Sequence, residues 1–464
     1  MDAPVLSQST TLEPEGRYTV VAAEQEPGHT VRLVEADAGT GLIQRTVLPG
    51  GLRVVTEAVP ALRSAAFGIT ADTGSRDEDT AHAGAAHFLE HLLFKGTKRR
   101  GAQEISVLMD GVGADHNAYT TKEQTTFYTK SLDQDLGLAI DVVSDMITSS
   151  VLDPGEVETE RGVILEEIAM YEDEPSELVD DVFAARFFED SPLGRPILGS
   201  RETIGGLTRE RIQEQYERCY VPANLIVAAA GNLRHEQVVD WVTTAFDEQL
   251  HMAGNARPAP PRLGGQPVAS QPVASQPGTA LLSRDTEQAH VLLGRAGVTH
   301  TDERRHAVRV LTCILGGGPS SRLFQQVREQ RGLAYAVHGF TSCYADTGLV
   351  QIYVGCLPDK IDEVLAVCRG ELARAAEHGV TAEELARAKG QLRGSHVLAT
   401  EGASARMGRL TTHELSHPRH YSLAEDLAML DGVTTADVHR VAADLLGRPE
   451  ALAVIGPFLE GRTF

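Results

Sequence analysis

An internal duplication constrains the fold of this chain more than any other feature of its sequence. The segments FYTKSLDQDLGLAIDVV (127–143) and IYVGCLPDKIDEVLAVC (352–368) share a strand, a leucine, an acidic turn and an amphipathic helix, at an offset of 225 residues. Self-similarity of this kind is typical of an architecture that occurs twice. We therefore predict two similar halves.

A low-complexity segment separates the predicted halves. Residues 252–279 read MAGNARPAPPRLGGQPVASQPVASQPGT, in which QPVAS occurs twice. Pro, Gly, Ser and Ala dominate the segment, which is typical of a linker. We predict an N-terminal half at 38–251 and a C-terminal half at 280–464, with residues 1–37 as a flexible acidic tail.

Both halves are predicted to mix strands and helices in the same order. Strands are predicted within the segments 52–59, 64–72, 117–132, 223–246, 290–294, 334–344, 349–357 and 451–457. Helices are predicted around His87 and Leu311, and from residues 103, 133, 321 and 359. This mixture predicts an α+β fold in which antiparallel sheets are covered by helices.

Composition disfavours several classes of function. The 464 residues include 65 acidic and 42 basic side chains, and the net charge of −23 disfavours a nucleic-acid partner. Five cysteines without a CxxC pair suggest neither a disulfide framework nor a thiolate zinc site. Because we find no apolar run that could span a bilayer and no targeting segment, we expect a cytoplasmic protein without a membrane partner.

His87, Glu90 and His91 form the motif that points most directly to chemistry. They lie in the helical stretch AGAAHFLEHLLF, where His87 and His91 project from one face a turn apart, with Glu90 on the same side. Two imidazoles at this spacing can bind one zinc ion. An accidental match is expected in about one of ten such chains, so surface or core histidines remain the alternative.

Candidates for a third zinc ligand lie in the predicted helix PGEVETERGVILEEIAMY (154–171). Glu160 and Glu167 are seven residues apart and share one face, whereas Glu166 points elsewhere. A catalytic zinc site takes three protein ligands and keeps the fourth position for water. On composition alone, an ordinary solvated helix face is the better explanation of these glutamates.

These residues and their surroundings resemble the pitrilysin family of zinc metallopeptidases, whose inverzincin motif is HxxEH. The resemblance extends over nearly the whole chain from Ile43 and favours the short members, such as the mitochondrial processing peptidase β subunit and its bacterial homologues. The matching blocks are LPGGLRVVTE, GSRDE, AGAAHFLEHLLFKGTKRR, NAYTTKEQTTFY, ERGVILEEI and GGGPSSRLFQQVREQRGLAY.

The resemblance implies a zinc-dependent endopeptidase that hydrolyses unfolded peptides with one Zn²⁺ per chain. Its zinc ligands would be His87, His91 and Glu167. Glu160 would be a supporting acid, and Glu90 the general base. The C-terminal half carries Thr312, Leu315 and Gly316 at the positions that match His87, Glu90 and His91, so it should lack a zinc site.

Three further residues resemble substrate-contacting positions of the family. Arg328 and Tyr335 in VREQRGLAY match an Arg/Tyr pair that meets the substrate across the chamber, where they could bind a peptide carbonyl and the developing oxyanion. Asn117 begins the strand NAYTT, which resembles the edge strand that holds the substrate backbone. Without the resemblance, a surface Arg, a strand Tyr and a turn Asn explain them.

The resemblance also implies that the two halves close around a peptide chamber and bring Arg328 and Tyr335 to the zinc. We expect a homodimer, with a heterodimer that includes an inactive homologue as the alternative. Two other functions stay open: a non-catalytic interaction or chaperone-like subunit, and a processing peptidase for one precursor. The acidic composition adds the hypothesis that basic peptides are favoured.

Overall fold

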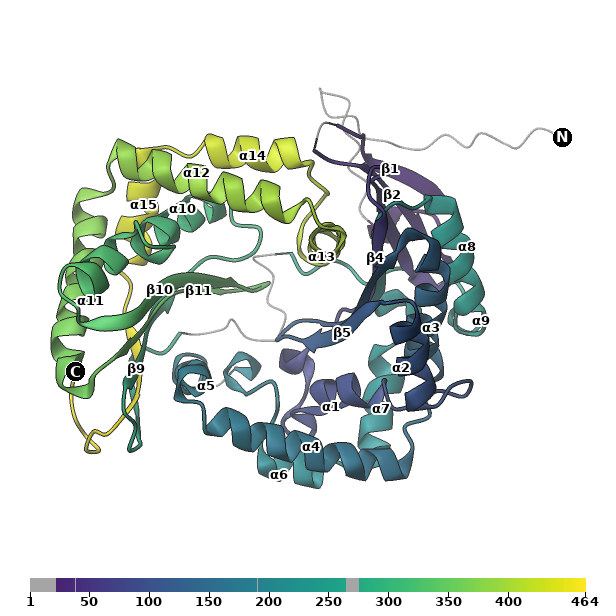
Figure 1. Ribbon diagram of the computed structural model, residues 1–464, viewed down its shortest axis with the longest axis horizontal. Helices are drawn as coiled ribbons and strands as arrows, with labels where there is room; N and C mark the ends of the chain where they lie inside the picture. Colours follow the sequence, from purple (N-terminus) through teal and green to yellow (C-terminus); the bar gives the residue numbers. More distant parts are fainter. Residues whose placement is uncertain (1–21, 38, 190, 264–274) are drawn as a thin grey trace.

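The computed structural model describes residues 22–37, 39–189, 191–263 and 275–464. Two sheets stand on opposite sides of the molecule, and helices cover the outer face of each (Figure 1). The predicted α+β fold with two similar halves is therefore confirmed. Across the described part of the chain, every helix is too short or too polar to cross a bilayer.

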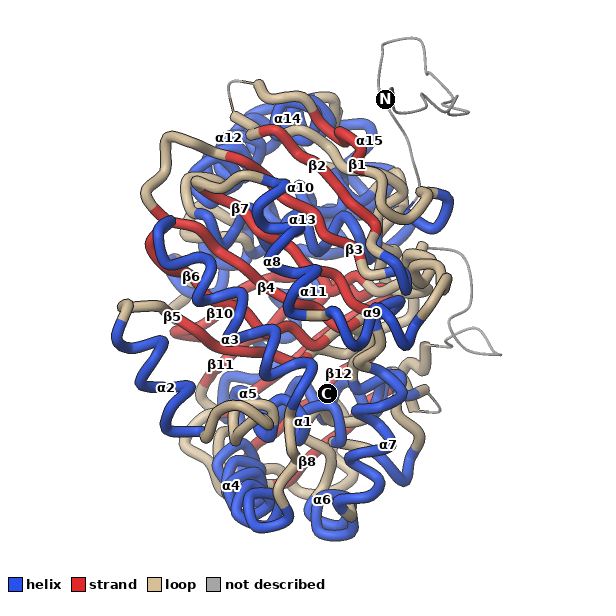
Figure 2. The backbone as a smooth tube through the Cα atoms, turned by 90° about the vertical axis from the view of Figure 1, so that its right-hand side faces the viewer, coloured by secondary structure: helices blue, strands red, loops and turns tan. Residues whose placement is uncertain are grey.

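The first sheet has the order β1-β2-β3-β7-β4-β6-β5. Its strands, in that order, are Thr30–Val34, Leu42–Val47, Arg53–Ala58, Leu225–Gly231, Ser64–Ala71, Thr125–Leu132 and Asp115–Thr120. Helices α3 (Leu136–Ser149) and α8 (His235–Ala245) cross its outer face (Figure 2). The predicted apolar strand is β7, in which every residue is buried because side chains pack on both faces.

The second sheet has the order β10-β11-β9-β12-β8. Its strands, in that order, are Ala334–Cys343, Gly348–Cys356, Ala289–Ala296, Ala451–Gly456 and Gly278–Ser283. Helices α10 (Arg305–Gly316), α11 (Ile361–His378) and α15 (Thr435–Leu445) pack against it in one core. Strand β12 is the counterpart of β7, because it too is buried on both faces. Leu452 and Val454 face these helices, whereas Ala451, Ala453 and Ile455 face the other way.

The prediction that the sheets are antiparallel is wrong for one pair in each sheet. Strand β3 pairs with β7 in parallel, and β8 pairs with β12 in parallel at the equivalent place. Parallel neighbours need a long crossover connection. The helices between β3 and β7, and those between β8 and β12, supply it.

The predicted boundaries of the tail and linker also need correction. Residues 30–34, expected in a flexible tail, form β1 and pair with β2. The predicted linker overlaps α9 (Asp247–Ala253) and β8 at its ends, and its residues 264–274, like residues 1–21 of the tail, lie outside the described residues. Within the described part of the linker, Arg262 forms ion pairs with Asp72 at 2.6 Å and Asp77 at 2.8 Å, so this part is bound to the first half.

The two halves exchange one helix each, which a division at the linker does not predict. Helix α5 (Pro175–Phe187), from the first half, packs Val179, Phe183 and Phe187 on the inner face of the second sheet. Helix α13 (Ala403–Ser416), from the second half, lies on the inner face of the first sheet (Figure 1). The residues of α13 in this core are Ala403, Met407, Leu410 and Leu415. Each half therefore completes the core of the other.

Candidate metal centre

Helix α1 (Ala85–Leu92) carries the HxxEH motif and is held at its N-terminus by a buried carboxylate. Glu78 accepts hydrogen bonds from the backbone N–H groups of Gly84, at 2.9 Å, and Ala86, at 2.6 Å. Burial raises the pKa of Glu78 to about 7. Gly84 itself has φ of 94°, and a Cβ there would lie 2.6 Å from Ile204, so this turn requires glycine. The start of α1 is thus fixed in place.

Helix α4 (Pro154–Glu172) supplies the glutamates. Asp153 caps it by accepting a 2.8 Å hydrogen bond from the N–H of Gly155, and Pro154 occupies the first helical position. Apolar side chains join α4 to α1 in one core, to which α1 contributes Phe88, Leu89 and Leu92 and α4 contributes Val157, Ile164 and Ile168. This packing sets the two helices close enough for their polar side chains to meet.

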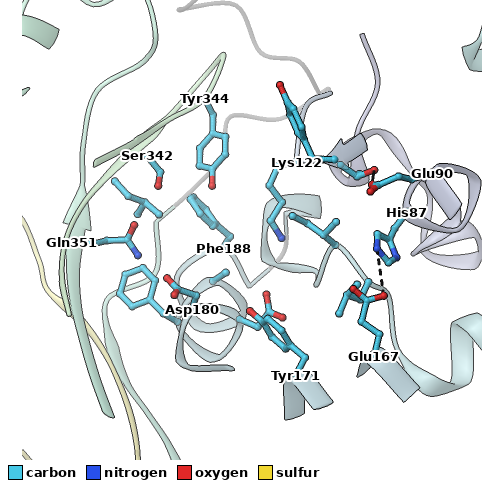
Figure 3. A pocket seen from close by; sticks show the side chains of 18 of the residues that line it. His87, Glu90, Lys122, Glu167, Tyr171, Asp180, Phe188, Ser342, Tyr344 and Gln351 are labelled. Carbon is cyan, nitrogen blue, oxygen red and sulfur yellow. Dashed lines mark hydrogen bonds and ion pairs between the residues drawn. The ribbon is translucent and has the colours of Figure 1, made fainter. Parts of the chain in front are cut away.

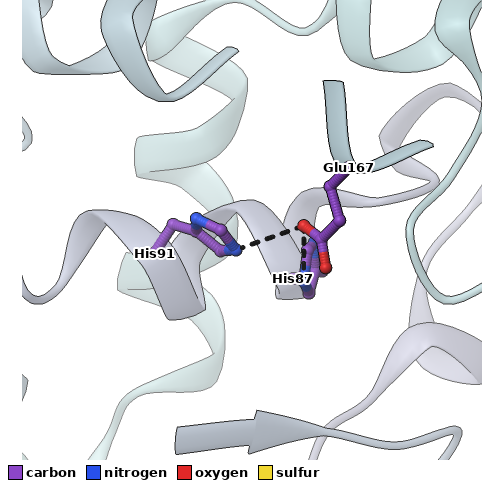
Figure 4. Close-up of side chains that lie close together, drawn as sticks. All are labelled: His87, His91 and Glu167. Carbon is purple, nitrogen blue, oxygen red and sulfur yellow. Dashed lines mark ion pairs between the residues drawn. The ribbon is translucent and has the colours of Figure 1, made fainter. Parts of the chain in front are cut away.

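His87, His91 and Glu167 converge with the spacing of metal ligands (Figure 4). Glu167 Oε2 lies 3.7 Å from His87 Nε2 and 3.6 Å from His91 Nε2. Two ligand atoms on a tetrahedral zinc ion lie about 3.3 Å apart. Among the described residues, this is the one set of three or more His, Cys, Asp or Glu side chains that meets ligand spacing.

The chemical state of these side chains fits a metal ion. Glu167 Oε2 is buried without a hydrogen-bond partner, a state that costs free energy unless a cation satisfies it. Burial and the neighbouring His91 lower the pKa of His87 to about 3, so its imidazole is neutral and able to bind a metal. Two histidines and one glutamate are a ligand set that zinc takes in peptidases.

Glu160 and Lys95 fix the orientation of the His91 ring. Glu160 Oε2 accepts a hydrogen bond from His91 Nδ1 at 3.1 Å, while Lys95 Nζ pairs with Glu160 Oε1 at 2.6 Å. The bond at Nδ1 leaves Nε2 of His91 directed at Glu167, which is how second-sphere carboxylates orient metal-binding histidines. Sequence reasoning identified Glu160 but missed Lys95, although Lys95 follows His91 by four residues.

Glu90 lies beside the predicted ligands. Thr120 Oγ1, at the end of β5, donates a 2.6 Å hydrogen bond to Glu90 Oε2. Burial raises the pKa of Glu90, which favours its protonated form once a proton is available. Thr120 was also missed, because its partner follows only from the way β5 lies over α1.

A cavity of about 440 Å³ opens at these residues. His87, Glu90 and Glu167 line one side, and Ser342, Tyr344 and Gln351 of the second half line the other (Figure 3). Helix α5 forms a further wall with the carboxylates of Asp180 and Asp181. Partial desolvation, together with the charges of Glu177 and Asp181, raises the pKa of Asp180 to about 6. Both halves therefore shape this cavity.

The structure does not bring Arg328 and Tyr335 to this cavity. The Arg328 guanidinium lies between two rings, 4.8 Å from the centroid of Phe324 and 4.5 Å from that of Tyr335, and Tyr335 is 76% exposed. Tyr335 is the second residue of β10, whereas Ser342, which lines the cavity, lies near the end of that strand, about 23 Å away along an extended chain. The expectation that closure within one chain brings the pair to the zinc is therefore corrected.

The remaining predicted positions are placed as follows. Asn117 is exposed on β5, the edge strand of the first sheet, and its Oδ1 accepts a 2.8 Å hydrogen bond from the N–H of Ala118. Its role in holding a substrate backbone stays a prediction. Thr312, Leu315 and Gly316 are buried in α10, so the second half has apolar packing where the first has its ligands.

Comparison with known proteins identifies the family. The model described as "Insulinase (Peptidase family M16)" matches residues 53–201, and that described as "Peptidase M16 inactive domain" matches residues 206–392. An uncharacterized zinc protease of Streptomyces coelicolor is 50% identical over 92% of this chain and 92% of its own length. The chain belongs to peptidase family M16, the pitrilysin family. Another relative, an uncharacterized zinc protease of Bacillus subtilis, is 35% identical over 90% of this chain and 98% of its own length.

Solved structures support the M16 fold. A protease from Helicobacter pylori superposes with a TM-score of 0.79 at 20% identity, covering 89% of this chain and 99% of that chain. A peptidase M16 inactive domain from Pseudomonas fluorescens gives 0.80 at 19% identity, covering 91% and 99%. At this identity the likeness extends to the fold alone.

Proposed function

We propose that this chain is a zinc-dependent endopeptidase that hydrolyses unfolded peptides in the cavity between its halves. The observation that carries the proposal is the convergence of His87, His91 and Glu167 in a cavity that Glu90 also lines. The names of the relatives from S. coelicolor and B. subtilis, both zinc proteases, support zinc as the metal.

Each residue has a definite part in this proposal. A zinc ion in such a site lowers the pKa of water and polarises a scissile carbonyl. Glu90 accepts the proton of the attacking water at a carboxylate oxygen and returns it to the leaving amine. Thr120 holds that carboxylate in place through its hydrogen bond, and Glu160 keeps His91 in the orientation in which Nε2 faces Glu167.

Removal of the metal tests the proposal directly. Purified protein should contain about one zinc per chain, and a chelator should abolish hydrolysis of an unfolded peptide until about one equivalent of zinc is restored. Metal analysis and a fluorogenic peptide assay measure both quantities. Hydrolysis that persists in metal-free protein would contradict the proposal.

The carboxylates on α5 lead to a prediction about substrate selectivity. Asp180 and Asp181 line the cavity that His87 lines, so we propose a preference for peptides with basic side chains. Because the pKa of Asp180 is raised to about 6, its charge is lost as the pH falls through that value. The ratio of kcat/KM for an Arg-containing peptide to that for its Gln analogue should therefore rise between about pH 5 and pH 7.

Asp180→Asn should flatten this pH dependence and lower the ratio about three- to tenfold, while hydrolysis of the Gln peptide changes little. Asp173→Asn, which alters an exposed carboxylate at the end of α4, is the matched control. An unchanged Arg/Gln ratio in Asp180→Asn would refute this selectivity.

We also propose that the protein acts as a homodimer. The stack of Phe324, Arg328 and Tyr335 lies outside the cavity of its own chain, and Tyr335 is exposed. In a homodimer these side chains would contact the substrate bound in the cavity of the partner copy. The mass of the purified protein in solution distinguishes this dimer from a monomer.

A further inference from the structure

Five histidines of the second half gather where α13 approaches α10, α12 (Ala382–Ala399) and α14 (Leu423–Asp431), away from the metal centre. The ring centroid of His413 lies 5.1 Å from that of His417 and 5.2 Å from that of His420. His306 on α10 is close enough to His417 and to His396 on α12 for their charges to interact. We call His306, His396, His413, His417 and His420 the histidine cluster.

Several ring nitrogens of the histidine cluster are buried without a hydrogen-bond partner. They are both ring nitrogens of His306, Nε2 of His396, and Nδ1 of His413 and of His420. Their spacing does not match a metal site, since the one set of described ligand atoms that does is His87, His91 and Glu167. Unpaired buried imidazole nitrogens call for another physical account.

Charged side chains surround the histidine cluster and influence the protonation of its imidazoles. Arg305 and Arg309 on α10 and Arg409 on α13 lower the pKa values of histidines in the cluster, and His300 lowers the pKa of His417. Two carboxylates also face it. Asp426 on α14 lies 3.8 Å from His396 Nε2 and 3.9 Å from Arg409, while Glu414 is shared at 2.8 Å by His420 and at 2.9 Å by Arg45 of the first half.

Burial and these neighbouring cations keep the imidazoles neutral. The pKa of His306 and that of His417 are each lowered to about 4, and burial holds the pKa of His413 well below its usual value. The pKa values of His396 and His420 are also lowered, mainly by burial. Near neutral pH the cluster therefore adds no charge beside the three arginines.

The histidine cluster lies where α13 connects the two halves, so the protonation of its imidazoles can affect how the halves are held together. One side of α13 is fixed to the first sheet by Met407 and Leu410, while His413 on α13 and His417 directly after it interact with Arg305 on α10 of their own half. We propose that the histidine cluster is a pH-sensitive joint, which holds α13 against the second half while its imidazoles are neutral and loosens when they are protonated among Arg305, Arg309 and Arg409. Loosening lets the two halves separate and widens access to the cavity.

The direction of the pH effect follows from linkage. In a separated state the imidazoles regain an ordinary pKa of about 6.5, so that state binds more protons than the closed one. Separation is therefore favoured progressively as the pH falls from about 6.5 toward about 4, and the closed state is fully favoured above that window. This inference concerns opening alone and does not depend on the proposed peptidase activity.

Hydrogen exchange on the full-length protein tests the joint. Protection factors for residues 403–416, corrected for the intrinsic pH dependence of exchange, should fall at least about tenfold between about pH 7.5 and pH 5.5. In His306→Gln/His417→Gln, which cannot be charged at these two positions but keeps the other three histidines, the fall should be at least about threefold smaller than in the wild type. The matched control is His251→Gln, since His251 is 83% exposed on α9 and should leave the wild-type response unchanged.

A second variant keeps the test decisive if the double substitution impairs folding. Arg309 is exposed, and Arg309→Gln removes one of the cations that oppose protonation, so the pH at which α13 loses protection should move lower. Unchanged protection of α13 across the pH range would overturn the proposal. The proposal would also be overturned if His306→Gln/His417→Gln lost as much protection of α13 as the wild type. A midpoint pH of this loss in Arg309→Gln equal to the wild-type midpoint would overturn it as well.

Discussion

Glu90→Gln is expected to keep about one zinc per chain and to lose peptide hydrolysis by about 10² to 10⁴-fold. The amide has the shape of the carboxylate and can still accept the hydrogen bond from Thr120, so α1 and the three predicted ligands stay in place. An amide oxygen cannot take the proton of the attacking water. Metal analysis and single-turnover hydrolysis of one peptide measure the two effects separately.

The matched control for this substitution is Glu166→Gln. Glu166 is exposed on α4 next to the predicted ligand Glu167, and its loss should change hydrolysis less than about twofold. If Glu90→Gln is as active as wild type, Glu90 is not the base. If neither the wild type nor Glu90→Gln hydrolyses peptides although both bind zinc, the non-catalytic interaction subunit becomes the better account.

Leu410→Ala is expected to lower the free energy of unfolding by about 2–5 kcal/mol. Leu410 on α13 is 0% exposed, and it belongs to the core that α13 forms with Ile226 and Ala228 of the first sheet. Its truncation removes apolar contacts and leaves a void between the halves. Denaturant unfolding followed by tryptophan fluorescence reports the change, because Trp241 lies on α8 of the first half.

Leu398→Ala provides the comparison for this prediction. The same side chain is deleted from α12, but Leu398 is 73% exposed, so the free energy of unfolding should change by no more than about 0.5 kcal/mol. Equal losses in the two variants would mean that α13 does not stabilise the first half. A loss confined to Leu410→Ala supports the exchange of helices between the halves.

Local patterns were sufficient to predict much of the candidate centre. The four-residue spacing of His87 and His91 and the seven-residue spacing of Glu160 and Glu167 each follow from one helix, and the resemblance to the family paired the two helices. Thr120 and Lys95 were not predicted, because each meets its carboxylate only after separate elements have packed. The same limit applies to Arg328 and Tyr335, whose sequence carries no information on which cavity they face.

Local patterns also predicted the buried strands of the fold, but not which sheet each helix packs against. The apolar run of β7 identified a buried strand, and the matching run of β12 followed from the duplication. The apolar faces of α5 and α13 indicate burial but cannot say against which sheet, so the exchange of helices was missed. Strand β1 was missed because it is a short edge strand in which no residue is fully buried.

The exchange of helices also has a consequence for synthesis on the ribosome. Phe183 and Phe187 of α5 find their partners in Leu292 and in Ala453 of β12, which is made close to the end of translation. Until then the first half holds an apolar helix without its sheet, a state that favours aggregation or capture by chaperones. The first half should therefore reach its native fold only after the last strand has left the exit tunnel, and fragments cut at the linker should not fold separately.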